Sequence, residues 1–522
     1  MKQHIKKYCL VFLLLLAAIL PLTGCGKDDQ AGSEASAREE LVISVGSGQA
    51  SGGYDPCTGY GTYGYGIFHS ALLKFNPKIQ VEPDLATGYT VSDGGLTYTY
   101  TLREGLKFSD GEPITAKDVA FTYRTAKGSG SSVDLTMLDK AEAKDDLTVV
   151  FTLNKRWSAF ASTTALLGIV PEHAYGESYG DNPVCSGPFK VAQLDKNQQV
   201  IVVPNEYYHG QKPAFKKITI LELDEEAALA GAKSGELDVV MINPEYALEK
   251  VEGMHLETIK TVDNRGFNLP VIPEQKNAQG ELIGNNVTCN FEIRKALNIG
   301  IDRVTIIKNA LNGIGTPAYG RVDALPWYNE ATAFEDNRVE EACALLEKAS
   351  WVDKDGDGIR EKNGQKAEFR ITGRTDDLQR YNLAVALSED AKKLGINIIA
   401  EAVAWEDCKK MSRNVPTCWG SGNYSPIDLY NEYSSKNLGV GTQNTASYVN
   451  STVDNYFDKA LGSTSMEEAI RYWKLAQWDS KYNFRDEDVT MFYSPEDNVY
   501  IYENPSKVVT VDTNTGEIGL RL

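Results

Sequence analysis

The sequence predicts an α/β fold whose body has two unequal parts, and three observations support this prediction. The chain has 522 residues, 42% hydrophobic and 24% charged, which is enough for about three domains and excludes wholesale disorder. Segments in which apolar and polar side chains alternate dominate the first part. After about residue 290, longer helical patterns alternate with short strands, which is typical of crossover units and of a sheet covered on both faces.

The expected elements follow in chain order from local patterns. In the first part, we expect strands over 41–46, 97–102 and 148–153. Thr115 is the expected N-cap of a helix around 118–125, and the amphipathic segment 67–75 is expected to form a helix after a glycine-rich loop. In the second part, we expect helices over 339–350, 378–395 and 466–481, and strands over 367–372, 396–403, 499–503 and 507–512.

The first 25 residues resemble an export signal. A start with three lysines precedes an apolar run over 8–20, which is shorter than the ~20 residues that a membrane-spanning helix needs. The run leads to LTGC at 22–25, which resembles a bacterial lipobox. We therefore expect 1–24 to be a lipoprotein signal peptide and Cys25 to be the lipidation site, with a plain secretory cleavage site as the alternative.

Residues 25–40 are expected to form a flexible tether. Positions 26–40 contain no aromatic or β-branched residue that could join a core. No later segment has 18 consecutive apolar residues. The predicted location is therefore the cell membrane, with the protein lipid-anchored on the extracytoplasmic face.

Charge and composition exclude several function classes. With 72 Asp+Glu against 53 Lys+Arg and a net charge of -19, the chain lacks the basic character that broad binding to nucleic acid or an anionic membrane needs. The 27 tyrosines against five histidines favour recognition through aromatic surface over a histidine-built metal centre. We expect no cofactor, no resident metal and no nucleic-acid partner.

The cysteines form no recognisable metal or redox motif. Of the eight, Cys9 lies in the signal and Cys25 is the expected lipid carrier, and none of the other six forms a CxxC pair. Cys408 and Cys418 are close enough in sequence to pair, and isolated buried thiols are the alternative. The sequence leaves this disulfide open.

A collinear series of short motifs runs through the body. They are PDLA at 83–86, LR at 102–103, KFSDG at 107–111, TAKDV at 115–119, SGPF at 186–189, NEYY at 205–208, KP at 212–213, GELD at 235–238, IRKAL at 293–297 and DR at 302–303. In this order, and over about 41–522, the chain resembles the extracellular solute-binding proteins of family 5, which serve oligopeptide, dipeptide and nickel ABC importers.

The resemblance implies a two-lobe, periplasmic-binding-protein-like (venus flytrap) fold. Lobe I is expected over 41–263, with an inserted subdomain at about 71–184, lobe II over 264–488, and a C-terminal return to lobe I over 489–522. The lobes would close by a hinge on a small solute and then dock on the permease subunits of an ABC importer. A monomer without enzymatic activity is expected.

One loop of the second lobe bears on the ligand. In peptide-binding relatives, a Trp three positions before an Asp opens this loop, and the Asp pairs with the peptide's α-ammonium group. In those relatives the loop ends in Asp or Glu followed by Pro. Here Trp419 matches the Trp and Pro426 matches the Pro, but Gly422 stands at the Asp position. Trp419 with Tyr424 also resembles nickel-binding relatives, whose Arg and His contacts have no match here. We expect an oligopeptide-like solute, with nickel or another metal chelate as the alternative, and contacts from Trp419, Asn423 and Tyr424.

A second concentration of aromatic residues follows the first strand, with Tyr54, Tyr60, Tyr63 and Tyr65 spaced by glycines. In the family this loop lines the cleft, so Tyr60, Tyr63 and Tyr65 are candidate ligand contacts. Rigid phenols on such a loop offer stacking surface and hydroxyl groups with little side-chain entropy to lose. The alternative is a surface loop whose rings cover the edge of the sheet.

Two further motifs have weaker functional interpretations. The stretch 59–64 fits GxGxxG, but bulky tyrosines fill two of its three variable positions and an exported protein meets no dinucleotide pool. The stretch Asp353–Gly358 resembles the start of an EF-hand loop, yet Gly364 stands where a bidentate Glu is required. We expect an acidic turn there, with a weak calcium site as the alternative.

An extracytoplasmic hydrolase is the remote alternative to a binding protein. No GxSxG, HExxH or P-loop pattern is present in the sequence. The acidic pairs 145–146 and 376–377 are expected to face solvent rather than to form a buried acid/base pair.

Overall fold

The computed structural model describes residues 39–44, 53–61, 66–129, 133–259, 262–323, 325–421, 424–480, 490–494, 499–503, 510–511 and 520–521. They belong to the unit Glu39–Leu522. The expected signal peptide, Cys25 and nearly all of the expected tether lie outside the described residues. So do Tyr63, Tyr65 and Asn423.

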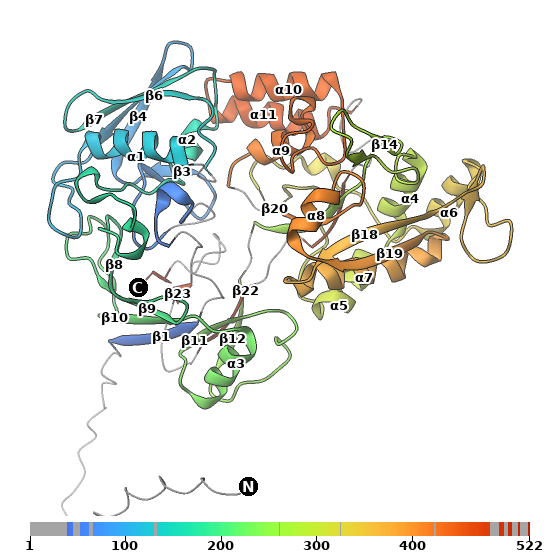
Figure 1. Cartoon of the computed structure of the whole chain (residues 1–522), viewed down its shortest axis with the longest axis horizontal. Coiled ribbons are helices and arrows are strands. Elements are labelled where there is room, and N and C mark those ends of the chain that lie inside the picture. Colours follow the sequence, from blue (N-terminus) through green and yellow to red (C-terminus); the bar gives the residue numbers. More distant parts are fainter. Residues whose placement is uncertain are drawn as a thin grey trace, which may run out of the picture. The chain divides into compact units, whose positions relative to one another are not determined.

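Segments far apart in the chain build the first sheet (Figure 1). Its strands are β1 (Glu40–Ser44), β8 (Phe189–Asp195), β9 (Gln199–Pro204), β10 (Lys217–Leu221), β11 (Val239–Ile242), β12 (His255–Ile259) and β22 (Val499–Glu503), in the order β12-β22-β11-β1-β10-β9-β8. β1 pairs in parallel with β10 and β11, and β22 lies antiparallel between β11 and β12. Leu41 and Ile43 are buried, which confirms the expected first strand.

A second, antiparallel sheet has the order β4-β5-β7-β6. It consists of β4 (Ala86–Ser92), β5 (Thr97–Leu102), β6 (Leu138–Ala143) and β7 (Thr148–Leu153), which confirms the strands predicted from alternation. Helix α1 (Ala116–Ser129) packs against it. The Thr115 hydroxyl accepts a hydrogen bond from the Lys117 amide, and the Asp118 carboxylate accepts bonds from the Thr115 amide and hydroxyl, each at 2.9 Å. The expected N-cap is confirmed.

The helix expected over 67–75 does not form. The structure instead has a turn at 67–68, an irregular stretch, and a short hairpin of β2 (Leu73–Phe75) and β3 (Val81–Pro83). The physical reason is that this segment joins two cores: Phe68 packs with Leu41 and Val202, whereas Leu72 belongs to the core around α1. Apolar side chains that serve two different cores imitate a helical pattern.

The second part of the body contains the predicted crossover unit. β18 (Glu368–Arg374) and β19 (Asn397–Val403) are parallel, and α7 (Leu378–Ala391) connects them and packs on both (Figure 1). A three-stranded antiparallel sheet has the order β20-β13-β21, with β20 (Cys418–Ser421), β13 (Asn264–Asn268) and β21 (Thr490–Ser494). The helix expected over 466–481 is α11 (Met466–Gln477) and ends earlier, because Trp478 is extended.

The remaining elements are short. The helices are α2 (Phe160–Thr163), α3 (Glu225–Ser234), α4 (Phe291–Gly300), α5 (Arg303–Leu311), α6 (Val339–Lys348), α8 (Trp405–Met411), α9 (Ile427–Tyr433) and α10 (Ser451–Gly462). Two-stranded pairs are formed by β14 (Gln275–Lys276) with β15 (Leu282–Ile283), β16 (Glu361–Lys362) with β17 (Gln365–Lys366), and β23 (Thr510–Val511) with β24 (Leu520–Arg521).

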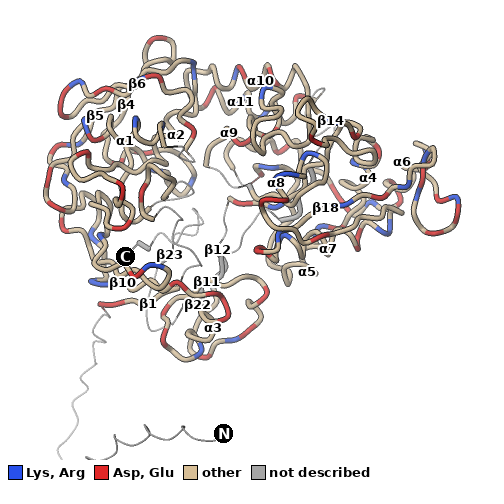
Figure 2. The backbone as a smooth tube through the Cα atoms, viewed as in Figure 1, with Lys and Arg blue, Asp and Glu red and all other residues tan. Residues whose placement is uncertain are grey.

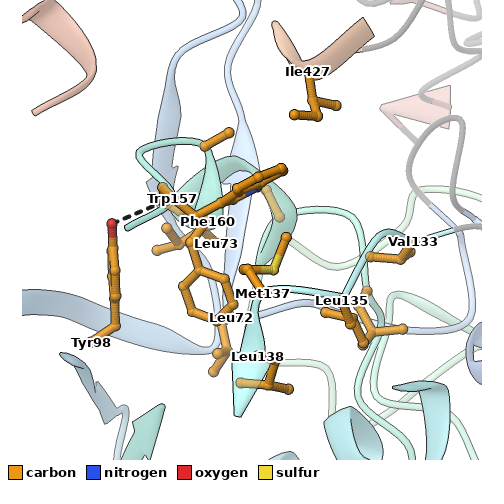
Figure 3. Close-up of a cluster of buried hydrophobic side chains, with 14 of the residues drawn as sticks. Leu72, Leu73, Tyr98, Val133, Leu135, Met137, Leu138, Trp157, Phe160 and Ile427 are labelled. Carbon is orange, nitrogen blue, oxygen red and sulfur yellow. Dashed lines mark hydrogen bonds between the residues drawn. The ribbon is translucent and has the colours of Figure 1, made fainter. Parts of the chain in front are cut away.

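One hydrophobic core joins the early sheet to the late helices. Figure 3 shows Leu72, Trp157 and Phe160 close together, with Ile427 reaching in from α9. At the edge of this core, the Ser158 amide donates to the Leu461 carbonyl at 3.0 Å and its hydroxyl to that of Ala460 at 2.8 Å. One backbone and one side-chain hydrogen bond therefore reinforce the apolar contact between distant parts of the chain.

Charge and hydropathy of the described residues agree with the composition. Acidic and basic residues are interspersed over the described backbone (Figure 2). Among the described helices, none combines the length and the apolar character needed to cross a membrane.

Candidate functional site

Trp419 lies on β20 against a second tryptophan. Its ring meets that of Trp405, at the start of α8, edge to face with 5.3 Å between centroids. Trp419 is half-buried, and its indole Nε1–H is buried without a hydrogen-bond acceptor among the described residues. This aromatic pair forms the centre of the candidate site.

Three arginines surround the tryptophan pair. The guanidinium carbons of Arg374 and Arg380 lie 4.6 and 5.9 Å from the Trp405 ring centroid, within reach of a cation–π interaction. A Cβ added to Gly420 would lie 2.5 Å from Nη1 of Arg265 and 2.8 Å from Nη2 of Arg380, so both guanidinium groups approach the backbone beside Trp419. We call Arg265, Arg374, Arg380, Trp405, Trp419 and Gly420 the Trp419 cluster.

Aspartates orient these arginines. Arg374 forms a two-point pair with Asp376, at 2.8 and 2.6 Å, which raises the pKa of Arg374 and lowers that of Asp376. Arg265 pairs with Asp263. Asp377 caps the N-terminus of α7 and lies 2.8 Å from Nε of Arg380. The acidic pair 376–377, expected to face solvent, thus helps to fix the basic cluster, although Asp376 itself is exposed.

Residues of the first part of the body contact the start of α7 through the loop after β11. Gln379, in the first turn of α7, donates to the Asn243 side-chain oxygen at 2.7 Å. Burial and, second, the charge of Asp377 raise the pKa of Glu245. Burial and then Glu245 raise the pKa of Glu225 to about 6. Carboxylates of the first part therefore lie within electrostatic range of the start of α7.

Tyr424 lies in the core. Its exposed fraction is 6%, and its ring stacks on Phe75 of β2 with 5.5 Å between centroids. Helix α9 follows Tyr424 in the chain. Its Asp428 carboxylate accepts a hydrogen bond from the Arg321 guanidinium at 2.6 Å, and its Glu432 carboxylate accepts one from the Asn268 side-chain amide at 2.6 Å. These buried polar contacts hold α9, and with it Tyr424, against the sheet.

Tyr60 packs against its own sheet. It is half-buried, stacked on Phe68 at 5.8 Å and edge-on to Tyr54 at 5.2 Å. Below it, His69 Nε2 lies 2.8 Å from the Tyr179 hydroxyl, which itself donates to the Val184 carbonyl. Burial lowers the pKa of His69 to about 3. The contacts of Tyr60 fit the alternative in which its ring covers the sheet.

The acidic turn at Asp353–Gly358 forms ion pairs with a lysine side chain of the same chain. Carboxylate oxygens of Asp353, Asp355 and Asp357 lie within 4.8 Å of one another, and all three residues are exposed. The Lys366 ammonium pairs with Asp355 at 3.2 Å and with Asp357, and this contact lowers the pKa of Asp357. The turn is thus closed by a lysine side chain.

The six cysteines beyond Cys25 are thiols that form no disulfide bond, and Cys57, Cys185, Cys408 and Cys418 are buried. Cys408 and Cys418, whose pairing the sequence left open, contact different neighbours: the Cys408 thiol faces the Val403 carbonyl at 3.5 Å, and Cys418 belongs to the core with Phe267. Burial raises the pKa of the Cys408 thiol.

Comparison with a solved structure identifies the fold. The structure of NikA from Brucella suis in complex with Fe(III)-EDTA matches with a TM-score of 0.77 at 20% identity, covering 92% of this chain and 98% of that one. At this identity the match shows the fold alone. It confirms the predicted two-lobe α/β fold of periplasmic binding proteins.

The sequence identifies the family within this class. The chain belongs to the bacterial extracellular solute-binding proteins, family 5, whose middle-region model matches residues 80–466. Protein XP55 of Streptomyces lividans is 33% identical over 463 residues, covering 85% of this chain and 81% of the relative. The oligopeptide-binding protein AppA of Bacillus subtilis is 26% identical over 472 residues, covering 84% and 82%. The resemblance found in the motifs is confirmed.

The structure brings only part of the expected site together. Trp419 is central to a cluster, whereas Tyr60 and Tyr424 pack in different cores. Arg265, Arg374, Arg380 and Trp405 were missed by sequence reasoning. One signal for them was present: a glycine directly after a strand tryptophan indicates that another group approaches the backbone closely.

Proposed function

We propose that the protein captures an oligopeptide-like solute outside the cytoplasmic membrane and delivers it to the permease of an ABC importer. The observation that carries this proposal is the family match over residues 80–466 together with the two-lobe fold. The relative AppA, which its name describes as oligopeptide-binding, supports a peptide as the ligand. In this function the protein binds and releases its solute unchanged, as a monomer and without a cofactor.

A metal chelate is the second candidate ligand. The fold match to NikA in complex with Fe(III)-EDTA favours it, as does the combination of guanidinium groups and indole rings in the Trp419 cluster. Such a cluster can hold the carboxylates of a chelate without ligating the metal directly.

We assign the lobes and contacts as the family resemblance implies. Lobe I comprises 41–263, with the inserted subdomain at about 71–184, and lobe II comprises 264–488, before the return over 489–522. The proposed ligand contacts are Tyr60, Tyr63, Tyr65, Trp419, Asn423 and Tyr424. The position of Trp419 between aromatic and basic side chains supports its assignment most directly.

Ligand-induced stabilisation tests the proposed function. Native mass spectrometry of the purified protein would reveal a co-purified solute, and thermal shifts would be measured with synthetic tri-, penta- and nonapeptides and with nickel–histidine. A ligand at 100 times its dissociation constant stabilises the folded state by about 2.7 kcal/mol. Stabilisation by a peptide supports the first candidate, and stabilisation by the chelate alone supports the second. A protein stabilised by neither would overturn the transport function.

Replacing Trp419 by Ala should weaken binding of the stabilising probe by about tenfold or more, because a half-buried indole contributes a large contact surface. Without ligand, the Trp419→Ala variant should remain folded. Titration calorimetry measures the affinity, and Tyr207→Ala, which removes an exposed ring elsewhere, is the control. Equal affinity of Trp419→Ala and the control would remove Trp419 from the site.

We propose that the protein is anchored through a lipid on Cys25 after removal of residues 1–24. The family description as extracellular supports a location outside the cytoplasm, and the LTGC motif supports the anchor. Replacing Cys25 by Ala should abolish labelling by a radioactive fatty acid and leave the signal uncleaved at this site. Unchanged fatty-acid labelling would contradict the assignment.

A further inference from the structure

We propose that a buried contact between the two parts of the body is a clasp that holds the protein closed, so that its opening limits both entry and release of the solute. The clasp consists of Trp157, Ser158, Ile427, Tyr430, Ala460 and Leu461, none of which belongs to the Trp419 cluster. The inference rests on the proposed function and deepens it, because it names what controls the rates of binding and release.

The first argument is where the chain passes between the two parts. It crosses from the first sheet to the three-stranded sheet between β12 and β13, and it returns between β21 and β22. Both crossings begin and end side by side, because Ile259 pairs with Val499 and Arg265 pairs with Ser494. Neighbouring crossings form a hinge about which one part can rotate against the other. A contact made by other segments of the two parts is then free to break on rotation.

The second argument is how deeply the clasp is buried. Trp157 and Ile427 are 3% and 7% exposed, and Ile427 of α9 reaches into the core around Leu72 and Phe160 (Figure 3). The Tyr430 ring meets the Trp157 ring edge to face, with 6.2 Å between centroids. Opening would expose these side chains to water, which is unfavourable. The closed state is therefore favoured before any solute binds.

The third argument is the polar edge of the clasp. The Ser158 amide and hydroxyl donate to the carbonyls of Leu461 and Ala460, at 3.0 and 2.8 Å. Both carbonyls lie in the last turn of α10, where a helix leaves acceptors over that water can also satisfy. These bonds therefore fix where the two parts meet and still allow the contact to open.

Each side of the clasp is fixed to its own part of the body. The Tyr98 hydroxyl of β5 donates to the Trp157 carbonyl at 3.3 Å (Figure 3). On the other side, the Tyr430 ring of α9 meets Phe457 of α10 with 5.9 Å between centroids. Rotation would therefore separate the two parts at the clasp rather than within either part.

Binding kinetics test the clasp on the purified wild-type protein. The probe is the peptide of the tri- to nonapeptide set, or the nickel–histidine complex, that stabilises the protein. The observed association rate should reach a plateau at high probe concentration, because opening precedes binding. Stopped-flow tryptophan fluorescence measures this rate. A rate that rises in proportion to probe concentration throughout would overturn the proposal.

Two variants weaken the clasp from opposite sides. Ser158→Asp places a carboxylate against the carbonyl end of α10, and Ile427→Ala removes apolar contact. Each should speed both association and dissociation by about fivefold or more and change affinity by less than about threefold, because the clasp is closed with and without solute. The matched controls are Ser451→Asp, at the exposed start of α10, and Ile399→Ala, which truncates an exposed side chain of β19. Both controls should keep the wild-type rates. A loss of affinity without faster association would make the clasp residues solute contacts instead and would contradict the inference.

Small-angle X-ray scattering tests the clasp without a solute and so separates it from the proposed function. Wild type should have the same radius of gyration with and without the probe, whereas unliganded Ser158→Asp should be larger. If both variants are folded, as melting temperatures show, and keep the rates and radius of their controls, the contact is a permanent part of the core. The inference is then wrong while the transport function stands. If no probe binds wild type, the proposed function fails, and equal radii of the unliganded variants and controls would also refute the clasp.

Discussion

His69 is a buried histidine with a defined tautomer. The Tyr179 hydroxyl donates its proton to the Val184 carbonyl, so the Nε2–H of His69 must donate to Tyr179. The other ring nitrogen is buried and has no partner among the described residues. Protonation would place an unpaired charge in the core, which explains why burial lowers the pKa of His69 to about 3.

The low pKa of His69 predicts a specific loss of stability in acid. Its pKa is lower in the folded than in the unfolded chain, so its contribution is present above the unfolded value of about 6.5 and is lost as the pH falls toward 3. Between pH 7.5 and 5 this residue should cost about 2 kcal/mol of unfolding free energy. Urea unfolding at both values measures it, and His69→Gln should lack this component.

The control for this prediction is His255→Gln, because His255 is exposed. This variant keeps His69 and should therefore keep the pH-dependent component of stability that His69 contributes. An identical pH dependence in His69→Gln and wild type would show that His69 does not remain neutral in the folded state.

At the residue scale, the sequence offered Trp419 as a candidate ligand contact and gave no indication of the residues that surround it in the structure. Trp419 belongs to a recognisable loop motif. Arg265, Arg380 and Trp405 lie far from it in the chain and meet it only because β13 pairs with β20 and α8 follows β19. The burial of Tyr424 against Phe75 is likewise a long-range contact that local spacing does not encode.

At the scale of elements, α7 lies unusually close to β18. A Cβ on Gly373 would come within 2.4 Å of the Tyr381 Cα and 2.6 Å of its nitrogen. Only a residue without a side chain allows the first turn of the helix to rest on the strand. This contact also places Arg374 and Arg380, which lie on these two elements, over the same tryptophan.

Replacing Gly373 by Ala should therefore destabilise the protein by about 1–3 kcal/mol, because the helix must move away from the strand. Urea unfolding measures the change. Gly128→Ala, in the last turn of α1 with no atom near the added Cβ, is the control and should stabilise by about 0.5–1 kcal/mol. A Gly373→Ala protein as stable as wild type would contradict this view of the packing.

Elements with a strong local pattern were predictable, and elements set by tertiary context were not. Alternation identified β5 and β7, and the pattern of strand, helix and strand identified β18, α7 and β19. The segment 67–75 was mistaken for a helix because its apolar residues serve two cores. Which distant strands share a sheet, such as β11 with β22, follows from the family resemblance rather than from local pattern.

At the scale of the whole molecule, the end of the chain completes structures begun much earlier. β22 lies between β11 and β12, and β21 pairs with β13. A chain that stops after residue 488 should leave β11 and β12 without their common neighbour. We expect it to lose cooperative unfolding and to aggregate through the exposed strand edges.

Deletion of 1–38 provides the comparison, since the unit Glu39–Leu522 excludes these residues. Circular dichroism during urea unfolding should show an unchanged midpoint for that deletion and no sharp transition for the chain ending at 488. A cooperative transition with an undiminished slope in the shorter chain would show that β21 and β22 are dispensable.

The late arrival of β22 also has a consequence for biosynthesis. Val240 of β11 pairs with Tyr502 of β22. The sheet that contains β1 therefore stays incomplete until almost the whole chain has left the ribosome. Such non-local pairing slows folding. For a polypeptide threaded through a membrane before it folds, as the proposed signal peptide requires, this delay keeps the nascent chain competent for translocation. The order of the strands in this sheet thereby delays folding until synthesis is almost complete.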